Sequence, residues 1–317
     1  MKKRDSILFA AWCVFRLGAL APTIHAAETA DAEADGFSLI PLAAYEFLSA
    51  GEQSLDSGSI GLIAMSPNLM IVGMYSLHSY REAALFDYPA EFHTVDALAD
   101  GKVGRHAYLG LFKSESDRPV AGGLATFQAA AVYGYAFLRG QNLTLTAGGG
   151  LALGDFGLTL PSGDPWPLIP VPYIRLDYRS RFIDSSFSFL TGPNLEVTIG
   201  PESKLRLKGD FRFDQMRDIR DLIFDCALQY RFFGPGHEMG DFAGVSAGFK
   251  NGMYGYVPAD REGTHDLAYR SVFGTLDLTL ISITGGYAFD MKETCRGEGD
   301  RSLGDGFFVS LQGMYQF

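Results

Sequence analysis

Apolar and polar residues alternate with a period of two along most of this 317-residue chain. The clearest example is the segment 204–214. There, apolar residues at the odd positions alternate with Arg206, Lys208, Asp210 and Arg212 at the even positions. Successive side chains of a β-strand point to opposite faces, so the pattern predicts a strand with one apolar and one charged face. The charged face is too polar for the core of a soluble domain, whereas the apolar face is continuous.

Similar short segments, separated by Gly, Pro, Asn, Asp and Ser, follow one another from residue 37 to the end of the chain. The fourteen segments that we predict as strands are 37–48, 59–65, 69–80, 105–113, 122–138, 143–153, 168–179, 182–190, 194–200, 204–214, 221–233, 241–254, 267–289 and 307–317. At about 10 residues per membrane-crossing strand, with connections of about the same total length, residues 37–317 predict 12 to 14 strands, with ten also possible. The number should be even, so that both termini lie in the periplasm.

The predicted connections are of two lengths. Tight turns are expected at residues 66–68, 191–193 and 201–203. Longer connections are expected at residues 81–104, 155–167, 251–266 and 291–306. Strict up-and-down counting does not bring these longer connections to one side, so at least one predicted strand boundary must be wrong.

The first 26 residues have the features of a cleaved export signal. A positive start is followed by an apolar centre at residues 7–21, and Ala26 closes a plausible cleavage site. Arg16 interrupts the apolar run, which is therefore a poor permanent membrane anchor. We expect residues 27–36 to be a flexible acidic lead-in and residues 37–317 to form a single barrel domain.

Composition narrows the class of protein further. Loss of residues 1–26 removes four basic residues and one acidic residue, which changes the formal charge from −11 to −14. Such a charge argues against nucleic acid as a partner. Hydrophobic residues make up 47% of the chain, and no apolar run of helix-spanning length follows the signal. A membrane protein without spanning helices must be a closed barrel, because unpaired backbone groups are costly in hydrocarbon. Cys226 is expected on the lipid face and Cys295 in a loop, so two unpaired thiols are favoured over a disulfide.

The last eleven residues resemble the C-terminal assembly signal of bacterial outer-membrane β-barrel proteins. Val309, Leu311, Tyr315 and the terminal Phe317 fall on one face of the predicted strand, as in that signal. Residues 168–233 are similar to porin-like outer-membrane barrels of unassigned function, which implies an all-β, antiparallel, up-and-down barrel and no particular activity. The resemblance also implies insertion by the barrel-assembly machinery, with periplasmic chaperones and outer-membrane lipid as partners.

Charged residues at alternate positions are expected to point into the barrel. The residues that we expect on this face are Arg175, Asp177, Arg179, Arg206, Lys208, Asp210, Arg212, Asp221, Asp225 and Arg231. A hairpin register that sets Arg212 opposite Asp221 also sets Lys208 opposite Asp225. These charges either select a solute or ion, as rings of charge do in pores, or brace a narrow barrel. Their mixed signs, which neutralise each other, favour bracing.

Candidate catalytic and metal-binding residues are sparse. The five histidines after the signal form no ligand spacing, so neither a metal nor another cofactor is predicted. His78 and Ser79 are expected to be a solvated, inert pair at a loop rim, because no orienting partner is recognisable. Residues 54–58 echo a serine-protease segment and are expected to be a loop. We therefore do not predict an enzyme.

Three functions remain open, in this order. The first is a pore for passive or facilitated passage of a small solute through the bacterial outer membrane. The second is a non-conducting surface barrel that acts through its loops, suggested by the acidic segment 81–104 with Phe86, Tyr88 and Phe92. The third is an enzyme within the barrel. Aromatic residues near the strand ends are expected to anchor the barrel at the lipid headgroups, although a ligand-binding aromatic track is an alternative.

Overall fold

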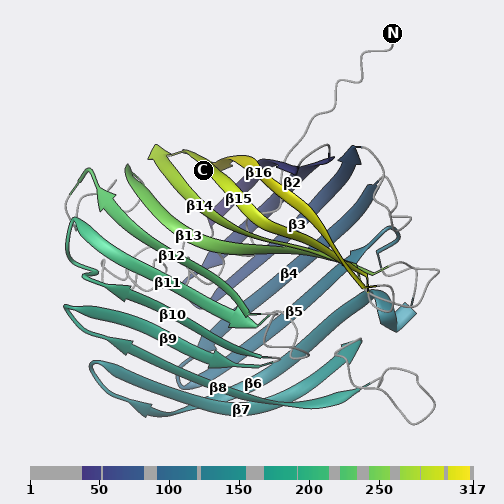
Figure 1. Cartoon of the computed structure of the whole chain (residues 1–317). Coiled ribbons are helices and arrows are strands. Elements are labelled where there is room, and N and C mark those ends of the chain that lie inside the picture. The colour runs from purple at the N-terminus through teal and green to yellow at the C-terminus, as the bar shows by residue number, and fades with distance from the viewer. Residues whose placement is uncertain are drawn as a thin grey trace.

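The computed structural model is a closed antiparallel β-barrel of sixteen strands (Figure 1). It describes residues 38–50, 53–81, 91–119, 123–154, 168–190, 192–213, 222–233, 243–257, 265–278, 280–295 and 299–314. The predicted signal sequence and the acidic lead-in lie outside these ranges. No helix in the described ranges has the length and apolar content needed to cross a bilayer.

Each strand pairs with its neighbours in the chain, and β1 pairs with β16 to close the wall. The strands are β1 (Ser38–Ala50), β2 (Gln53–Ser66), β3 (Leu69–Arg81), β4 (Glu91–Val103), β5 (His106–Ser116), β6 (Phe127–Arg139), β7 (Leu143–Gly154), β8 (Ile169–Arg179), β9 (Ile183–Phe189), β10 (Pro193–Ile199), β11 (Leu205–Phe213), β12 (Leu222–Arg231), β13 (Ala243–Tyr256), β14 (His265–Leu278), β15 (Ile281–Cys295) and β16 (Gly299–Met314). A short 3-10 helix, η2 (Gly123–Thr126), precedes β6. Closure leaves no unpaired sheet edge, which is the condition for a β-structure in lipid.

The predicted strand number of 12 to 14 is wrong, because the barrel has sixteen strands. β4 was predicted to be part of a long loop, because this strand has small residues such as Ala97 and Ala99 on its outer face and acidic residues on its inner face. β14 and β15 were predicted as one strand, because the sequence between Leu278 and Ile281 contains no Gly, Pro or Asn. Both errors come from weak local signals that strand pairing overrides.

Residues 291–306 were expected to form a long loop and instead form most of a hairpin. β15 extends to Cys295 and β16 begins at Gly299, and residues 292–295 pair with residues 299–302. The segment is charged and rich in glycine, which is typical of a loop when it is considered alone. Cys295 therefore ends a strand, contrary to the prediction.

The sixteen-strand count also fixes the end of the barrel at which each pair of successive strands is joined. Counting alternately from β1, the strand ends Arg81 and Glu91, Gly154 and Ile169, and Tyr256 and His265 all lie at the end of the barrel opposite to the start of β1 and the end of β16. Short turns such as 67–68, confirmed as predicted, lie at the end where β1 begins and β16 ends. We call these the loop end and the terminal end of the barrel. The even strand number brings the start of β1 and the end of β16 to the same side, as barrels of this class require.

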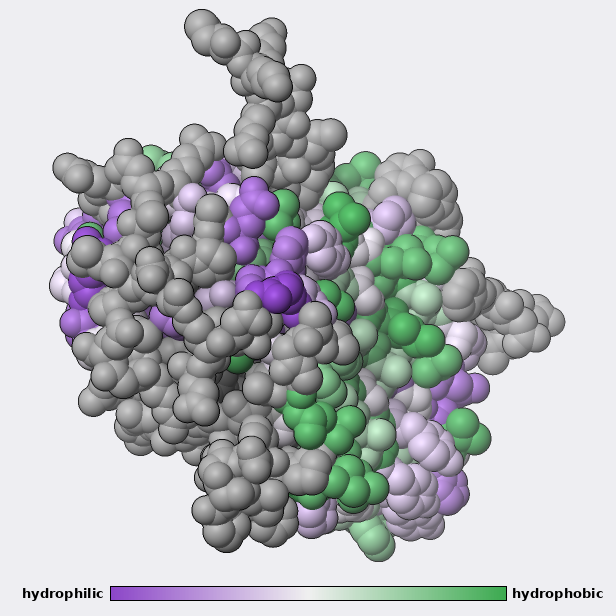
Figure 2. All heavy atoms as spheres, turned by 90° about the vertical axis from the view of Figure 1, so that its right-hand side faces the viewer, coloured by the Kyte–Doolittle hydropathy of each residue, from purple (hydrophilic) through white to green (hydrophobic). Residues whose placement is uncertain are grey.

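The outer surface of the barrel is apolar. Side chains such as Ile60, Val272 and Phe307 are more than a third exposed and point away from the interior. Figure 2 shows one side of the exterior, on which apolar side chains gather in a broad patch. Aromatic side chains surround the terminal end, where His106 contacts Tyr133 and Tyr108 packs on Tyr133. A closed barrel with an even strand number, an apolar outer band and interfacial aromatics is the architecture of bacterial outer-membrane proteins.

The inner face is divided into apolar and charged sectors. Three buried apolar clusters cover the inner faces of β1–β8 and β13–β16. One of them includes Leu42, Ile63, Met70 and Met74 from β1–β3. By contrast, charged side chains follow one another along the inner faces of β8–β12. The interior is thus an apolar wall facing a charged one, and the charged wall is the candidate site.

Candidate functional site

Strand pairing fixes which predicted charges share the inner face. Residues directly opposite each other in a sheet project to the same side. The pairing from β8 to β12 places nine of the predicted residues on the inner face, namely Arg175, Asp177, Arg179, Arg206, Lys208, Asp210, Arg212, Asp225 and Arg231. Asp221 lies outside the described residues. These side chains form one charged surface about five strands wide.

The predicted register between β11 and β12 is wrong by two residues. Lys208 is opposite Ala227 and Arg212 is opposite Ile223, whereas Asp210 is directly opposite Asp225. The prediction matched opposite charges within one hairpin. In the barrel each strand also pairs with a second neighbour, so charges are balanced across several strands rather than two.

Carboxylates form a row across this wall. Asp177 pairs with Ser186, Ser186 with Glu196, Glu196 with Asp210, and Asp210 with Asp225. Like charges directly opposite each other in a sheet repel, so the row requires cations nearby. Arg175 and Arg212 lie two residues along the strands from Asp177 and Asp210 on one side of the row, and Arg179 and Lys208 lie two residues away on the other. The wall therefore presents acidic groups between two basic borders.

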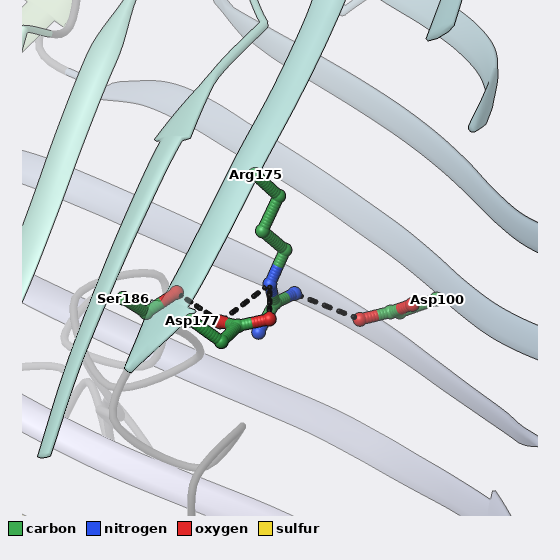
Figure 3. A network of polar contacts seen from close by, with 4 residues as sticks. All are labelled: Asp100, Arg175, Asp177 and Ser186. Atoms are coloured by element: carbon green, nitrogen blue, oxygen red, sulfur yellow. Dashed lines mark hydrogen bonds and ion pairs between the residues drawn. The ribbon is translucent and has the colours of Figure 1, made fainter. Parts of the chain in front are cut away.

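Arg175 connects this charged wall to the opposite side of the interior (Figure 3). Its Nε donates to Asp177 Oδ1 at 2.9 Å, and Ser186 Oγ donates to the same oxygen at 2.7 Å. Arg175 Nη1 lies 3.6 Å from Asp100 Oδ2 on β4, beyond the three intervening strands β5–β7. Asp100 was not among the predicted inner charges, because residues 81–104 were predicted to be a loop.

Glycines in the intervening strands make this crossing possible. Gly134 of β6 is opposite Gly148 of β7, which is opposite Tyr173 of β8. A Cβ atom added to Gly134 would lie 2.9 Å from Tyr173 Cδ1, so the Tyr173 ring lies directly over bare backbone. Because Gly134 and Gly148 have no side chains, the Arg175 side chain can extend over β5–β7 to Asp100.

Removal of Arg175 should widen the passage at this level. We expect Arg175→Ala to raise single-channel conductance by about twofold and to favour cations, because it removes a bridging side chain and leaves Asp100 and Asp177 facing each other. The measurement is conductance and reversal potential under a salt gradient. Arg181→Ala is the matched control, since the Arg181 side chain is 77% exposed and forms an ion pair with exposed Glu202. Equal conductance of both variants would contradict the prediction.

Charged groups nearer the terminal end brace the wall. Arg206 Nε donates to Gln229 Oε1 at 2.6 Å across the β11–β12 pair. Arg231 Nη2 donates to the carbonyl oxygens of Pro201 and Ser203 in the β10–β11 turn. The first bond joins two side chains of neighbouring strands, and the others hold Arg231 to the backbone of a neighbouring turn. The inner charges thus include both bracing and exposed groups.

His78 and Ser79 do not form the solvated rim pair that was expected. His78 is fully buried on the inner face of β3, while Ser79 points to the outer face. His78 Nδ1 lies 2.9 Å from Ser57 Oγ, and His78 Nε2 lies 3.0 Å from Thr94 Oγ1. Residues 54–58, predicted as a loop, lie in β2. A base touching a serine is the start of a nucleophilic site, but Ser57 is buried and the Phe92 ring covers His78, so a substrate has no access.

No group of three or more His, Cys, Asp or Glu side chains within the described ranges is arranged to hold a metal ion. Cys226 is a free thiol on the outer face of β12, opposite Gly209. Val309 and Leu311 of the predicted assembly signal lie on the outer face of β16. Tyr315 and Phe317 lie outside the described residues.

Comparison with known proteins adds a general likeness of shape. No family model and no curated protein matches the chain. Among solved structures, OpdK of Pseudomonas aeruginosa with vanillate is 9% identical, covers 89% of this chain and 98% of its own, and has a TM-score of 0.40. OccK7 (OpdD) and OpdQ of the same species are 11% and 9% identical over the same shares, with TM-scores of 0.40 and 0.41. At such scores the likeness adds nothing to what the geometry of the barrel shows by itself.

Proposed function

We propose that the protein is an outer-membrane pore for passive or facilitated passage of small hydrophilic solutes. The observation that carries the proposal is the contrast between the two faces of one closed wall. The outer face suits lipid, whereas the arc β8–β12 directs a carboxylate row and two basic borders inward. So many ionised groups are costly to bury in a dry interior, whereas a water-filled lumen would hydrate them.

Export by the predicted signal and insertion by the barrel-assembly machinery belong to the same proposal. Support comes from the outward position of Val309 and Leu311 on the last strand, where a lipid-facing recognition strand should present apolar side chains. The outer-membrane location follows from the same apolar exterior.

Planar bilayers test the proposal directly. Purified protein should give discrete conductance steps, and proteoliposomes should swell in small sugars or amino acids. Persistent silence in both assays, with the barrel shown to be folded by its heat-dependent gel mobility, would favour a non-conducting surface barrel. That alternative has lost one of its supports, because Phe92 is buried inside the wall rather than displayed on a loop.

The carboxylate row predicts the ionic preference of the pore. We expect Asp210→Asn to lower the cation-to-anion permeability ratio by about twofold, because it removes one negative charge beside Arg212 and Lys208. Reversal potentials under a potassium chloride gradient measure the ratio. Glu202→Gln is the control, since Glu202 has a 62% exposed side chain in a turn and should leave the ratio unchanged. An unchanged ratio in Asp210→Asn would show that the row does not face the ion path.

A further inference from the structure

Two strands on opposite sides of the barrel touch at the loop end. Seven strands separate β5 from β13 in either direction around the ring. Nevertheless, the backbone N–H of Val257, just after β13, donates to the carbonyl oxygen of Glu115 near the end of β5, at 2.9 Å. A hydrogen bond between diametrically opposed strands means that two sides of the wall meet across the interior at this level. Figure 1 shows the ends of β13–β16 converging toward the ends of the opposite strands.

Side chains extend this contact across the interior. The Tyr254 hydroxyl of β13 donates to Glu46 Oε1 of β1. The Tyr256 ring lies 5.4 Å from the Phe92 ring of β4, and the Tyr254 ring lies 5.8 Å from the His78 ring of β3. All five side chains point inward, and β13, which carries Tyr254 and Tyr256, is not a neighbour of β1, β3 or β4. The contact therefore joins the two sides of the barrel rather than bracing one side.

The wall is built to bend at this point. Strand register shifts between Ala268 and Arg270 in the β14–β15 pair, and again around Met291 in the β15–β16 pair. Asp290 has a φ of 51°, in the left-handed region, as bulged strands require. In β13, a Cβ atom at Gly252 would lie 2.3 Å from the Tyr269 ring, so only glycine lets that ring lie against the strand. Residues 252–257, 265–269, 291–295 and 299–304 lie beyond these features, and we call them the tip arm.

We propose that the tip arm is a gate that closes the loop-end mouth, and that release of its contacts with β1–β5 opens the lumen. The proposal rests on the proposed pore function and names how that pore is regulated. The polar contacts to be broken at the strand tip include the backbone hydrogen bond to Glu115 and the side-chain hydrogen bond of Tyr254 to Glu46. Opening must also separate apolar side chains of the tip arm from Leu48, Leu55 and Phe92, with which they share one buried cluster. The ring contacts with Phe92 and His78 are aromatic faces that can separate without leaving an unpaired charge. Below the bulges, the continuous ladders of β13–β16 hold the rest of the wall in place.

A reversible crosslink tests the gate. Glu115→Cys with Val257→Cys, in a Cys226→Ser and Cys295→Ser background, joins two backbones already within hydrogen-bonding distance, which suits disulfide geometry. Oxidised protein should conduct at least about tenfold less than the same protein after reduction. Tyr254→Phe keeps the ring but removes the hydrogen bond to Glu46, and it should raise the open fraction by about tenfold. Single-channel recording measures both.

The control crosslink does not cross the interior. Ser59→Cys with Ser76→Cys joins directly opposed residues on neighbouring strands β2 and β3, so its oxidation should leave conductance unchanged. If the Glu115–Val257 crosslink forms but oxidised and reduced proteins conduct equally, the gate is wrong and the pore stands. If the crosslink does not form in the folded barrel, the docking of the tip arm is wrong. If Tyr254→Phe and the reduced proteins never conduct, the proposed pore function itself is wrong.

Discussion

Replacing Ile60 with arginine is expected to destabilise the barrel by about 2–4 kcal/mol, the cost of arginine on the lipid face of a membrane barrel near its middle. Ile60 is 60% exposed and points outward near the centre of β2. For a barrel in water, the same substitution at an exposed site would change the free energy of unfolding by no more than about 0.5 kcal/mol. The free energy of unfolding in lipid vesicles, from guanidinium titration, measures the effect.

Ile60→Ala is the matched control for this experiment. It shortens the same side chain without adding charge, and at the lipid face it leaves no internal cavity, so lipid fills the space. We expect it to cost much less than Ile60→Arg. A harmless Ile60→Arg substitution would show that the exterior does not face hydrocarbon, and the pore and gate proposals would both lose their premise.

Replacing Phe92 with alanine is expected to cost about 3–5 kcal/mol, the range for truncating a buried phenylalanine. The Phe92 side chain is 1% exposed and lies between the His78 ring at 4.4 Å and the Tyr256 ring at 5.4 Å. Its loss opens a cavity between β4 and β13 and removes one side of the tip-arm contact. Unfolding in vesicles measures the stability, and bilayer recording should show a larger open fraction.

Phe137→Ala controls for the loss of an aromatic ring as such. Phe137 is 63% exposed on the outer face near the terminal end of β6, so its truncation leaves no internal cavity. We expect a clearly smaller loss of stability and no change in open fraction. Equal effects of the two truncations would contradict the packed arrangement at the loop end and support the earlier expectation that Phe92 belongs to an exposed segment.

The two contacts that cross the interior lie at opposite ends of the barrel. Asp100–Arg175 lies near the terminal end and joins β4 to β8, whereas the tip arm lies at the loop end and joins β13 to β1–β5. A solute entering from the loop end would meet the gate first and the charged wall afterwards. The gate would then decide whether the pore is open, and the charged wall would decide which solutes pass.

Strand prediction succeeded where both faces of a strand carry strong, opposite signals. In β11, Leu205 and Leu207 face outward and Arg206 and Lys208 face inward, so alternation alone identifies the strand. It failed for β4, whose inner face mixes Phe92 with Asp96 and Asp100 and whose outer face has small residues. Asp100 of β4 forms an ion pair with Arg175 of β8, and no local pattern contains that information.

By itself, the sequence determined the class of structure, because alternation with a period of two specifies an all-β wall with one face for lipid. The N-terminal segment that resembles an export signal and the C-terminal strand that resembles an assembly signal agree with that class. Only the tertiary structure decided the strand number, the β11–β12 register, the carboxylate row, the Asp100–Arg175 crossing and the closure at the loop end. The physical reason is that the apolar–polar period is a property of one strand and its solvent. Register and contacts across the interior instead depend on side chains far apart in the chain, which become neighbours only once the barrel closes.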